Sequence, residues 1–298
     1  MDIEAFYQSF YQDNVRNNNY IDFIGINVSS DSNAPFVLKI YQHIGTKIER
    51  ADAFLNLLDN KNMIKDYLPI VSSDVNRVQY DVRLANRRDQ NMEEVFRFLS
   101  NFWKMIDGMS DANLSQILHY SKMCITDLPD YTMSSLYFLG LLWNHEKLAA
   151  LKAHFLTRKV NNPDHFSDGF WYDDKYFLDY IRASNNKLCQ KIADITADIL
   201  DDLSGHLWML GVDGFSDTTA KYKIYLQDPT GFDLKKLAFL LSKYKEFDGM
   251  GSHLKELCVW SESHSELFLY GFAITVTSKE EYGFNLYFIP PPDLRGTT

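Results

Sequence analysis

One pattern of hydrophobic and polar residues recurs four times along this chain. Each copy begins with an apolar and aromatic run that contains a glycine, passes through a short polar stretch, and ends with an alternating run that carries Lys or Asn two residues before Tyr or His. Strict alternation is typical of a β-strand with two different faces, and two such runs around a polar turn predict a β-hairpin. The four copies occupy residues 20–42, 135–155, 206–226 and 267–288.

The spacing within each copy predicts the register of its hairpin. The glycine and the following Lys or Asn are an even number of residues apart, either 12 or 14, and their midpoint lies in the polar stretch. Residues equidistant from the turn face each other in an antiparallel hairpin, so each glycine is expected to pair with its Lys or Asn. The expected pairs are Gly25 with Lys39, Gly140 with Lys152, Gly211 with Lys223, and Gly271 with Asn285.

A fifth hairpin is predicted over residues 67–84, where the alternation is less regular and the glycine is missing. Gln79, Asp81 and Arg83 take the parity that carries Lys and Tyr in the other copies. Helical periodicity of the apolar residues separates the hairpins. The predicted helices cover residues 2–17, 47–59, 91–124, 173–203 and 232–245.

The alternation gives the predicted strands one apolar face, which the helices would cover, and one polar face. A ten-stranded sheet with one covered face tends to curl or close, and closure removes the unpaired edges. We therefore expect an α+β fold, a closed ten-stranded antiparallel β-barrel of five helix–hairpin–helix repeats with the helices outside. Residues 1–298 would form a single domain with a polar lumen. Trp208 alternates away from Gly211 and is expected to face the helices.

The composition narrows the functional classes. With 46% hydrophobic and 15% aromatic residues, the 298-residue chain can bury a large core. A formal net charge of −10 argues against a nucleic-acid-binding surface, and the three cysteines lack the spacing of a disulfide framework or metal site. The acidic N-terminus is unlike a signal peptide and no apolar run is long enough to span a membrane, so we expect a soluble cytosolic protein.

The repeated hairpins resemble a known family. Helix-flanked hairpins that carry Lys-x-Tyr, preceded by Lys or Arg, are similar to those of the ABBA aromatic prenyltransferases, whose fold is called the PT barrel. The resemblance extends over almost the whole chain, and the absence of a closing helix after the last strand resembles the cyanobactin-type members, which act on cyclic peptides. The copies are Lys221-Tyr222-Lys223-Ile224-Tyr225, Lys39-Ile40-Tyr41, Lys152-Ala153-His154 with His in place of Tyr, and Asn285-Leu286-Tyr287 with the family's amide variant.

The resemblance implies transfer of a dimethylallyl or longer isoprenyl group from an allylic diphosphate to an indole- or phenol-type acceptor, either a small molecule or a cyclic peptide. In such a dissociative electrophilic substitution, cations neutralise the departing diphosphate and aromatic faces stabilise the allylic cation, while the glycines would leave room for the donor. The implied diphosphate contacts are Lys39, Arg83, Lys152, Lys221, Lys223 and Asn285, and the implied cation shield is Tyr41, His154, Tyr225 and Tyr287.

Three carboxylates are candidates for the group that accepts the proton from the aromatic ring, and the sequence does not choose among them. Asp213 has the inward parity and Asp81 is an alternative, whereas Asp22 would face the lumen only if a β-bulge changed its parity. No protein-bound cofactor is required, although Mg²⁺ could accompany the diphosphate. The acidic run at residues 198–202 is interpreted as a charged helix end.

Two other functional classes remain open. A single Lys-x-Tyr motif also fits an ordinary solvated strand, so the argument depends on the four copies together. A non-catalytic barrel that carries a hydrophobic anion is one alternative, although such a carrier needs fewer cations than are clustered here. An open α+β interaction module is the other, and there substitution of Lys223 would leave diphosphate affinity unchanged.

Overall fold

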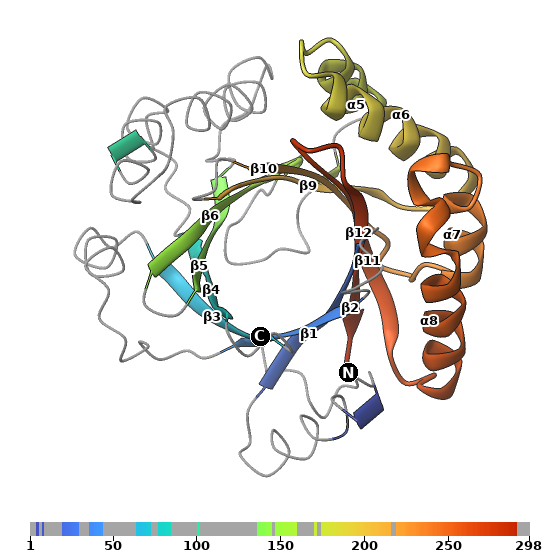
Figure 1. The fold of residues 1–298 in the computed structure, drawn as a ribbon, viewed down its shortest axis with the longest axis horizontal. Coiled ribbons are helices and arrows are strands. Elements are labelled where there is room, and N and C mark those ends of the chain that lie inside the picture. Colours follow the sequence, from blue (N-terminus) through green and yellow to red (C-terminus); the bar gives the residue numbers. More distant parts are fainter. Residues whose placement is uncertain are drawn as a thin grey trace.

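A computed structural model describes residues 4–5, 8, 20–29, 36–43, 64–72, 77–84, 100–101, 136–144, 147–159, 170–171, 174–215 and 219–290. In this part of the chain, strands pair into a closed antiparallel barrel in the order β1, β12, β11, β10, β9, β6, β5, β4, β3 and β2 (Figure 1). The strands are β1 (Tyr20–Ser29), β2 (Phe36–His43), β3 (Ile64–Ser72), β4 (Arg77–Leu84), β5 (Leu136–Asn144), β6 (Lys147–Leu156), β9 (His206–Phe215), β10 (Ala220–Gln227), β11 (Phe268–Thr277) and β12 (Tyr282–Ile289).

These strands form the hairpins that the alternation predicts. Successive strands pair as β1 with β2, β3 with β4, β5 with β6, β9 with β10, and β11 with β12. The second hairpin begins at Ile64, three residues earlier than expected. A separate two-stranded sheet, β7 (Arg158–Lys159) with β8 (Phe170–Trp171), was not predicted.

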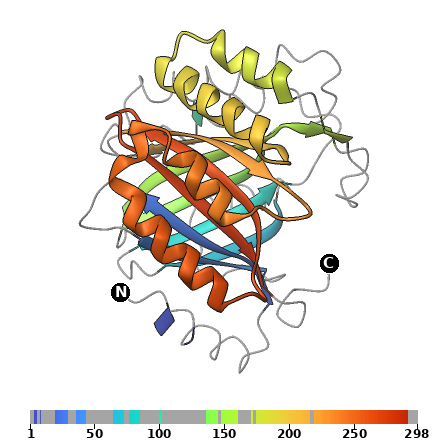
Figure 2. The same cartoon turned by 90° about the vertical axis from the view of Figure 1, so that its right-hand side faces the viewer.

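Helices cover the outside of the barrel next to β10, β11 and β12 (Figure 2). They are α5 (Asp174–Arg182), α6 (Lys187–Asp202), α7 (Leu234–Leu241), the 3₁₀ helix η2 (Lys245–Met250) and α8 (Gly251–Ser263). The predicted helices at 2–17, 47–59 and 91–124 fall almost entirely outside the described residues. None of the helices described is both long and apolar enough to cross a membrane.

The stretch 173–203, predicted as one helix, is divided into α5 and α6. Asn186 adopts an extended backbone (φ −92°, ψ 101°) and its side-chain oxygen accepts the N–H groups of Leu188 at 3.0 Å and Cys189 at 3.2 Å. This N-cap satisfies backbone donors that would otherwise lack partners. A new helix, α6, therefore begins after Asn186. The buried isoleucines of α6, among them Ile192 and Ile195, lie on the side of the helix that packs on the barrel.

The predicted register is confirmed in three hairpins and is wrong in the last. There Gly271 pairs with Tyr287, and an alanine takes the place opposite Asn285. The observed pairs at equivalent positions are Gly25 with Lys39, Gly140 with Lys152, Gly211 with Lys223, and Ala273 with Asn285.

The turn of the last hairpin explains the difference. The N–H of Thr277 donates to the carbonyl of Glu281 at 2.9 Å, so the turn is centred on residue 279 and not on 278. Glu280 adopts a left-handed backbone (φ 64°) inside this turn, a conformation in which non-glycine residues are uncommon. A one-residue shift of the turn moves the pairing by two residues along the strand.

A β-bulge recurs in the first strand of every hairpin described. In β9, Met209 pairs with Tyr225 and Leu207 pairs with Leu226, so Trp208 has no partner across this ladder. The same interruption occurs in β1, β3, β5 and β11. The residues skipped in the five strands are Asp22, Lys65, Tyr137, Trp208 and Tyr270. Three positions after each of them lies a residue that pairs with a central Lys, Asp or Asn of the second strand. These later residues are Gly25, Leu68, Gly140, Gly211 and Ala273.

The bulge corrects the prediction for Trp208. An extra residue changes the side-chain alternation on one side of it, and Trp208 and Met209 both line the cavity in the lumen. The expectation that Trp208 faces the helices is therefore wrong. Asp22 was expected to face the lumen only if a β-bulge changed its parity, and the backbone of β1 has a bulge at Asp22. The side chain of Asp22 lies outside the described part of the chain.

The outer face of the barrel carries the hydrophobic core. Ile40, Phe155, Ile224 and Phe284 are fully buried and join one cluster with residues of the helices. Phe247 of η2 belongs to the same cluster, with its ring 6.3 Å from that of Tyr282 and 6.4 Å from that of Phe284. Burial of these side chains on the outside leaves the inward parity free for polar groups.

We expect the substitution Phe247→Ala to lower the free energy of unfolding by about 3–5 kcal/mol, because it leaves a cavity in the core. Phe247 is 1% exposed, whereas Phe239 on α7 is 64% exposed. The matched control Phe239→Ala is expected to change stability by less than about 0.5 kcal/mol. Urea unfolding of both variants checks the contrast, and equal losses would contradict this assignment of the core.

Candidate active site

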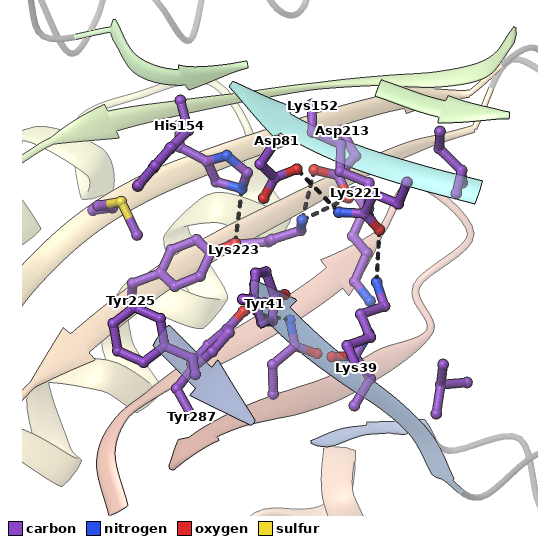
Figure 3. Close-up of a pocket in the computed structure, with 18 of the residues that line it drawn as sticks. Lys39, Tyr41, Asp81, Lys152, His154, Asp213, Lys221, Lys223, Tyr225 and Tyr287 are labelled. Carbon is purple, nitrogen blue, oxygen red and sulfur yellow. Dashed lines mark hydrogen bonds and ion pairs between the residues drawn. The ribbon is translucent and has the colours of Figure 1, made fainter. Parts of the chain in front are cut away.

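The lumen of the barrel contains a cavity into which side chains from eight strands point (Figure 3). Most of the predicted site residues line it. Arg83 and Asp22 lie in β4 and β1, but their side chains fall outside the described part of the chain. The predicted residues brought together are Lys39, Tyr41, Asp81, Lys152, His154, Asp213, Lys221, Lys223, Tyr225, Asn285 and Tyr287.

A glutamine joins two of the lysines in the polar part of the cavity. The side-chain oxygen of Gln79 accepts hydrogen bonds from Lys152 Nζ at 2.7 Å and from Lys39 Nζ at 3.0 Å. Its amide nitrogen donates to Asp81 Oδ1 at 3.1 Å. The two ammonium groups, which come from β2 and β6, therefore converge on one neutral oxygen of β4. Gln79 was assigned the inward parity but no role, and only its position between the lysines reveals one.

The other two lysines come from β10. Lys223 Nζ forms a buried ion pair with the carboxylate of Asp213 at 2.6 Å. Lys221 lies two residues earlier on the same strand, also lines the cavity, and pairs in the ladder with Asp213. Four lysines and two aspartates thus share the described part of the cavity, so cations outnumber carboxylates.

The protonation equilibria reflect this crowding of cations. Burial, together with repulsion from Lys152 and Lys223, holds the pKa of Lys39 well below its usual range. Burial and Lys223 lower the pKa of Lys221 to about 8, and burial lowers that of Lys152. A bound anion would favour the charged forms of all of them. The polar part of the cavity therefore has the electrostatic character of an anion site.

Aromatic rings form the neighbouring wall. Tyr287 lies between Tyr41 and Tyr225, with ring centroids 6.0 Å and 5.8 Å away. The Trp208 ring lies 6.3 Å from that of Tyr225 and 5.9 Å from that of Phe23. Such faces attract a cation and exclude water. Phe23 and Trp208 had no role in the sequence prediction. Phe23 shares the inward parity of Gly25, whereas only the bulge in β9 shows that Trp208 joins this wall.

The ring hydroxyls and the histidine are uncharged. Burial raises the pKa of Tyr41 and Tyr225 well above the usual value and that of Tyr287 to about 12, so the phenols keep their protons. Burial and the cation of Lys223 lower the pKa of His154 to about 3, so its imidazole is neutral. Its Nε2 lies 2.9 Å from the Tyr225 hydroxyl.

The glycines do not open space for a donor, which corrects the prediction. A Cβ at Gly25 would lie 2.9 Å from Tyr41 Cε2, and one at Gly211 would lie 2.9 Å from Tyr225 Cε2. The tyrosine rings therefore rest on the glycine backbones of the neighbouring strand. The absence of a glycine side chain lets one edge of each ring approach the wall of the barrel this closely.

The candidate proton acceptors differ in their surroundings. Burial opposes ionisation of Asp213, but Lys223 and Lys152 outweigh it and lower its pKa. Burial raises the pKa of Asp81, which accepts a hydrogen bond from Gln79. Both carboxylates lie among the lysines. Among the described residues, no three His, Cys, Asp or Glu side chains are grouped so that they could hold a metal ion.

Comparison with known proteins identifies the fold. No protein-family model matches the sequence, and no curated protein does. The crystal structure of AnaPT from Neosartorya fischeri is similar with a TM-score of 0.53 and 11% identity, over 93% of this chain and 79% of that chain. That of the NotF prenyltransferase is similar with a TM-score of 0.56 and 10% identity, over 90% and 80%. At such identities the likeness shows the fold, which is the prenyltransferase fold that the repeated motif implied.

We expect Gly140→Ala to destabilise the protein by about 1–3 kcal/mol, because the site is already closely packed. The added Cβ would lie 2.5 Å from Asp81 Oδ1 and 3.0 Å from Lys152 Cβ. Gly251, at the start of α8, serves as the control, since a Cβ added there would have no neighbouring atom within 4 Å. Gly251→Ala should keep or increase the free energy of unfolding in urea; a similar loss in both variants would refute the packing argument.

His154 should make the protein less stable in acid. Its pKa is about 3 in the folded protein and about 6.5 when unfolded, so between these values only the unfolded state binds the proton. The contribution of His154 to the free energy of unfolding should therefore fall by about 1.4 kcal/mol for each pH unit as the pH drops below about 6.5. Urea unfolding at about pH 7, 6 and 5 should show a shallower fall in His154→Gln than in the wild type, and parallel curves would contradict the prediction.

Proposed function

We propose that this protein transfers a dimethylallyl or longer isoprenyl group from an allylic diphosphate to an indole- or phenol-type ring. One observation carries the proposal: lysines of three strands and a wall of tyrosines of three strands line the same cavity. A diphosphate leaving group and an allylic cation are the two fragments that such a cavity would stabilise. The fold shared with the NotF prenyltransferase supports the same reaction class.

The polar part of the cavity suits the diphosphate. When the C1–O bond of the donor breaks, the electron pair leaves with the diphosphate, which carries about three negative charges. Lys39 and Lys152 already point at one shared acceptor, the oxygen of Gln79, and phosphate oxygens can replace it. Preorganised cations stabilise developing charge without reorganisation during the reaction.

The aromatic wall suits the allylic fragment. Tyr41, Tyr225 and Tyr287 present ring faces and protonated hydroxyls, so the wall contains no strong nucleophile to capture the cation. A nucleophilic ring carbon of the acceptor then forms the new C–C bond and loses a proton. The acceptor, a small molecule or a cyclic peptide, would enter beside Phe23 and Trp208, where its ring can stack.

A carrier of a hydrophobic anion remains the second candidate, since the same cavity would hold its cargo. The two functions differ in turnover. Incubation with dimethylallyl diphosphate and a panel of indole, tryptophan methyl ester and tyrosine methyl ester, each with and without Mg²⁺, should yield a product heavier by one prenyl unit. Binding of the diphosphate without product or diphosphate release, for any donor length, would favour the carrier.

We expect Lys152→Met to lower the rate of prenyl transfer by about 10²- to 10³-fold, because it removes one cation from the leaving group while it keeps a side chain of similar length. Lys152 is 5% exposed inside the barrel. Lys255→Met on the exposed surface of α8 removes the same charge outside the cavity and should leave the rate unchanged. Equal rates in the two variants, with both proteins folded by circular dichroism, would rule out this role for the lysines.

A further inference from the structure

Three phenols and an imidazole lie in a row across the cavity. The side chain of Tyr287 interacts with those of Tyr41 and Tyr225, whose ring centroids lie 6.0 Å and 5.8 Å from its own. The Tyr225 hydroxyl in turn lies 2.9 Å from His154 Nε2. The four groups come from β2, β12, β10 and β6, and all of them are labelled in Figure 3. The side-chain amide of Asn285 also donates to the Tyr287 hydroxyl, at 3.3 Å.

The row ends at His154, whose neutral imidazole can accept and hold a proton. The phenols stay protonated and can pass a proton on only by accepting another. The neutral imidazole of His154 has one ring nitrogen with a lone pair and, once protonated, two N–H donors. Its Nδ1 is buried and has no hydrogen-bond partner among the described residues. Asp213, by contrast, is engaged by Lys223 at 2.6 Å.

We propose that His154 is the terminal proton acceptor of the transfer reaction, reached through the hydroxyls of Tyr41, Tyr287 and Tyr225. This inference rests on the function proposed above. After the ring carbon has bonded to C1 of the prenyl group, its C–H bond breaks and the electron pair restores aromaticity. The proton passes to the nearest hydroxyl, each hydroxyl passes one proton on, and His154 ends as imidazolium while every phenol is neutral again.

A weak base is sufficient for this step. The ring cation formed by carbon–carbon bond formation is a very strong acid, so proton loss needs a positioned acceptor more than a basic one. The sequence places His154 where the family motif has tyrosine, so this acceptor is a feature of this chain.

The donor should strengthen the base. The charged groups that face His154 are Lys223 and Asp213 from β10 and β9, Lys152 from its own strand β6, and Lys39 from β2. The three lysines disfavour imidazolium, and a diphosphate bound to them would cancel that repulsion. His154 would therefore accept a proton readily only while the donor, or the diphosphate it releases, occupies the cavity.

Nuclear magnetic resonance tests this coupling without an acceptor. In ¹⁵N-histidine-labelled protein, the His154 ring signals are identified by their loss in His154→Gln. Saturating pyrophosphate should raise the pKa of His154 by at least about one unit in the wild type, and by less in Lys152→Met. Tyr225→Phe should shift the Nε2 signal, because its hydrogen-bond partner is removed. Pyrophosphate that binds without any change in the His154 titration would overturn the inference and leave the proposed function standing.

Kinetics test the proton transfer itself. His154→Gln should lower prenyl transfer to the acceptor panel by about 10²-fold or more, and a primary isotope effect should emerge with ring-deuterated acceptors, because proton loss becomes rate-limiting. His253→Gln on α8, outside the barrel, is the matched control and should keep the wild-type rate. An unchanged rate in His154→Gln would overturn the inference. Failure of pyrophosphate to bind, or of every acceptor to react, would overturn the proposed function and the inference with it.

Discussion

The burial of more positive than negative charge inside the barrel is the constraint on which this structure depends. Ammonium groups are costly to remove from water unless they are paired, and here Lys39 and Lys152 share a single neutral oxygen. The protein tolerates the arrangement because the large apolar core lies on the other side of the strands, between barrel and helices. Stability and function are thus assigned to opposite faces of the same sheet.

Closure of the sheet makes that division possible. Every barrel strand has hydrogen-bonded neighbours on both sides, so backbone pairing does not depend on the polar residues in the lumen. Side chains inside can then be selected for chemistry. An open sheet with the same alternation would expose these lysines to water, where they would neither repel one another strongly nor hold an anion tightly.

The recurring bulge divides the lumen into two chemical regions. It lies three residues before each position that faces a central polar side chain, and it lets consecutive residues such as Trp208 and Met209 both reach the cavity. The polar groups stay together on one side of the bulge, and the rings gather near it. A charged leaving group and a carbocation would therefore separate into different surroundings within one cavity, while the row from Tyr41 to His154 connects them.

The repeats show how one motif is adapted from copy to copy. In the second hairpin Asp81 takes the position that holds lysine elsewhere, and Leu68 takes that of the glycine. In the last hairpin Ala273 replaces the glycine opposite Asn285. The small residue matters where a ring must lie on the backbone, as Tyr41 does on Gly25. Where no ring needs that space, the position accepts a side chain.

The sequence alone determined the hairpins, the inward parity of the lysines and tyrosines, and the register of three Gly–Lys pairs, because strand alternation and distance from a turn are local properties. It could not place Trp208, whose orientation follows from a bulge, or the last register, which depends on the hydrogen bonds of one turn. Nor could it show that Gln79 lies between Lys39 and Lys152, or that His154 meets Tyr225. Those contacts join residues 40 to 73 positions apart, and only the curvature and stagger of the closed barrel bring them within hydrogen-bond distance.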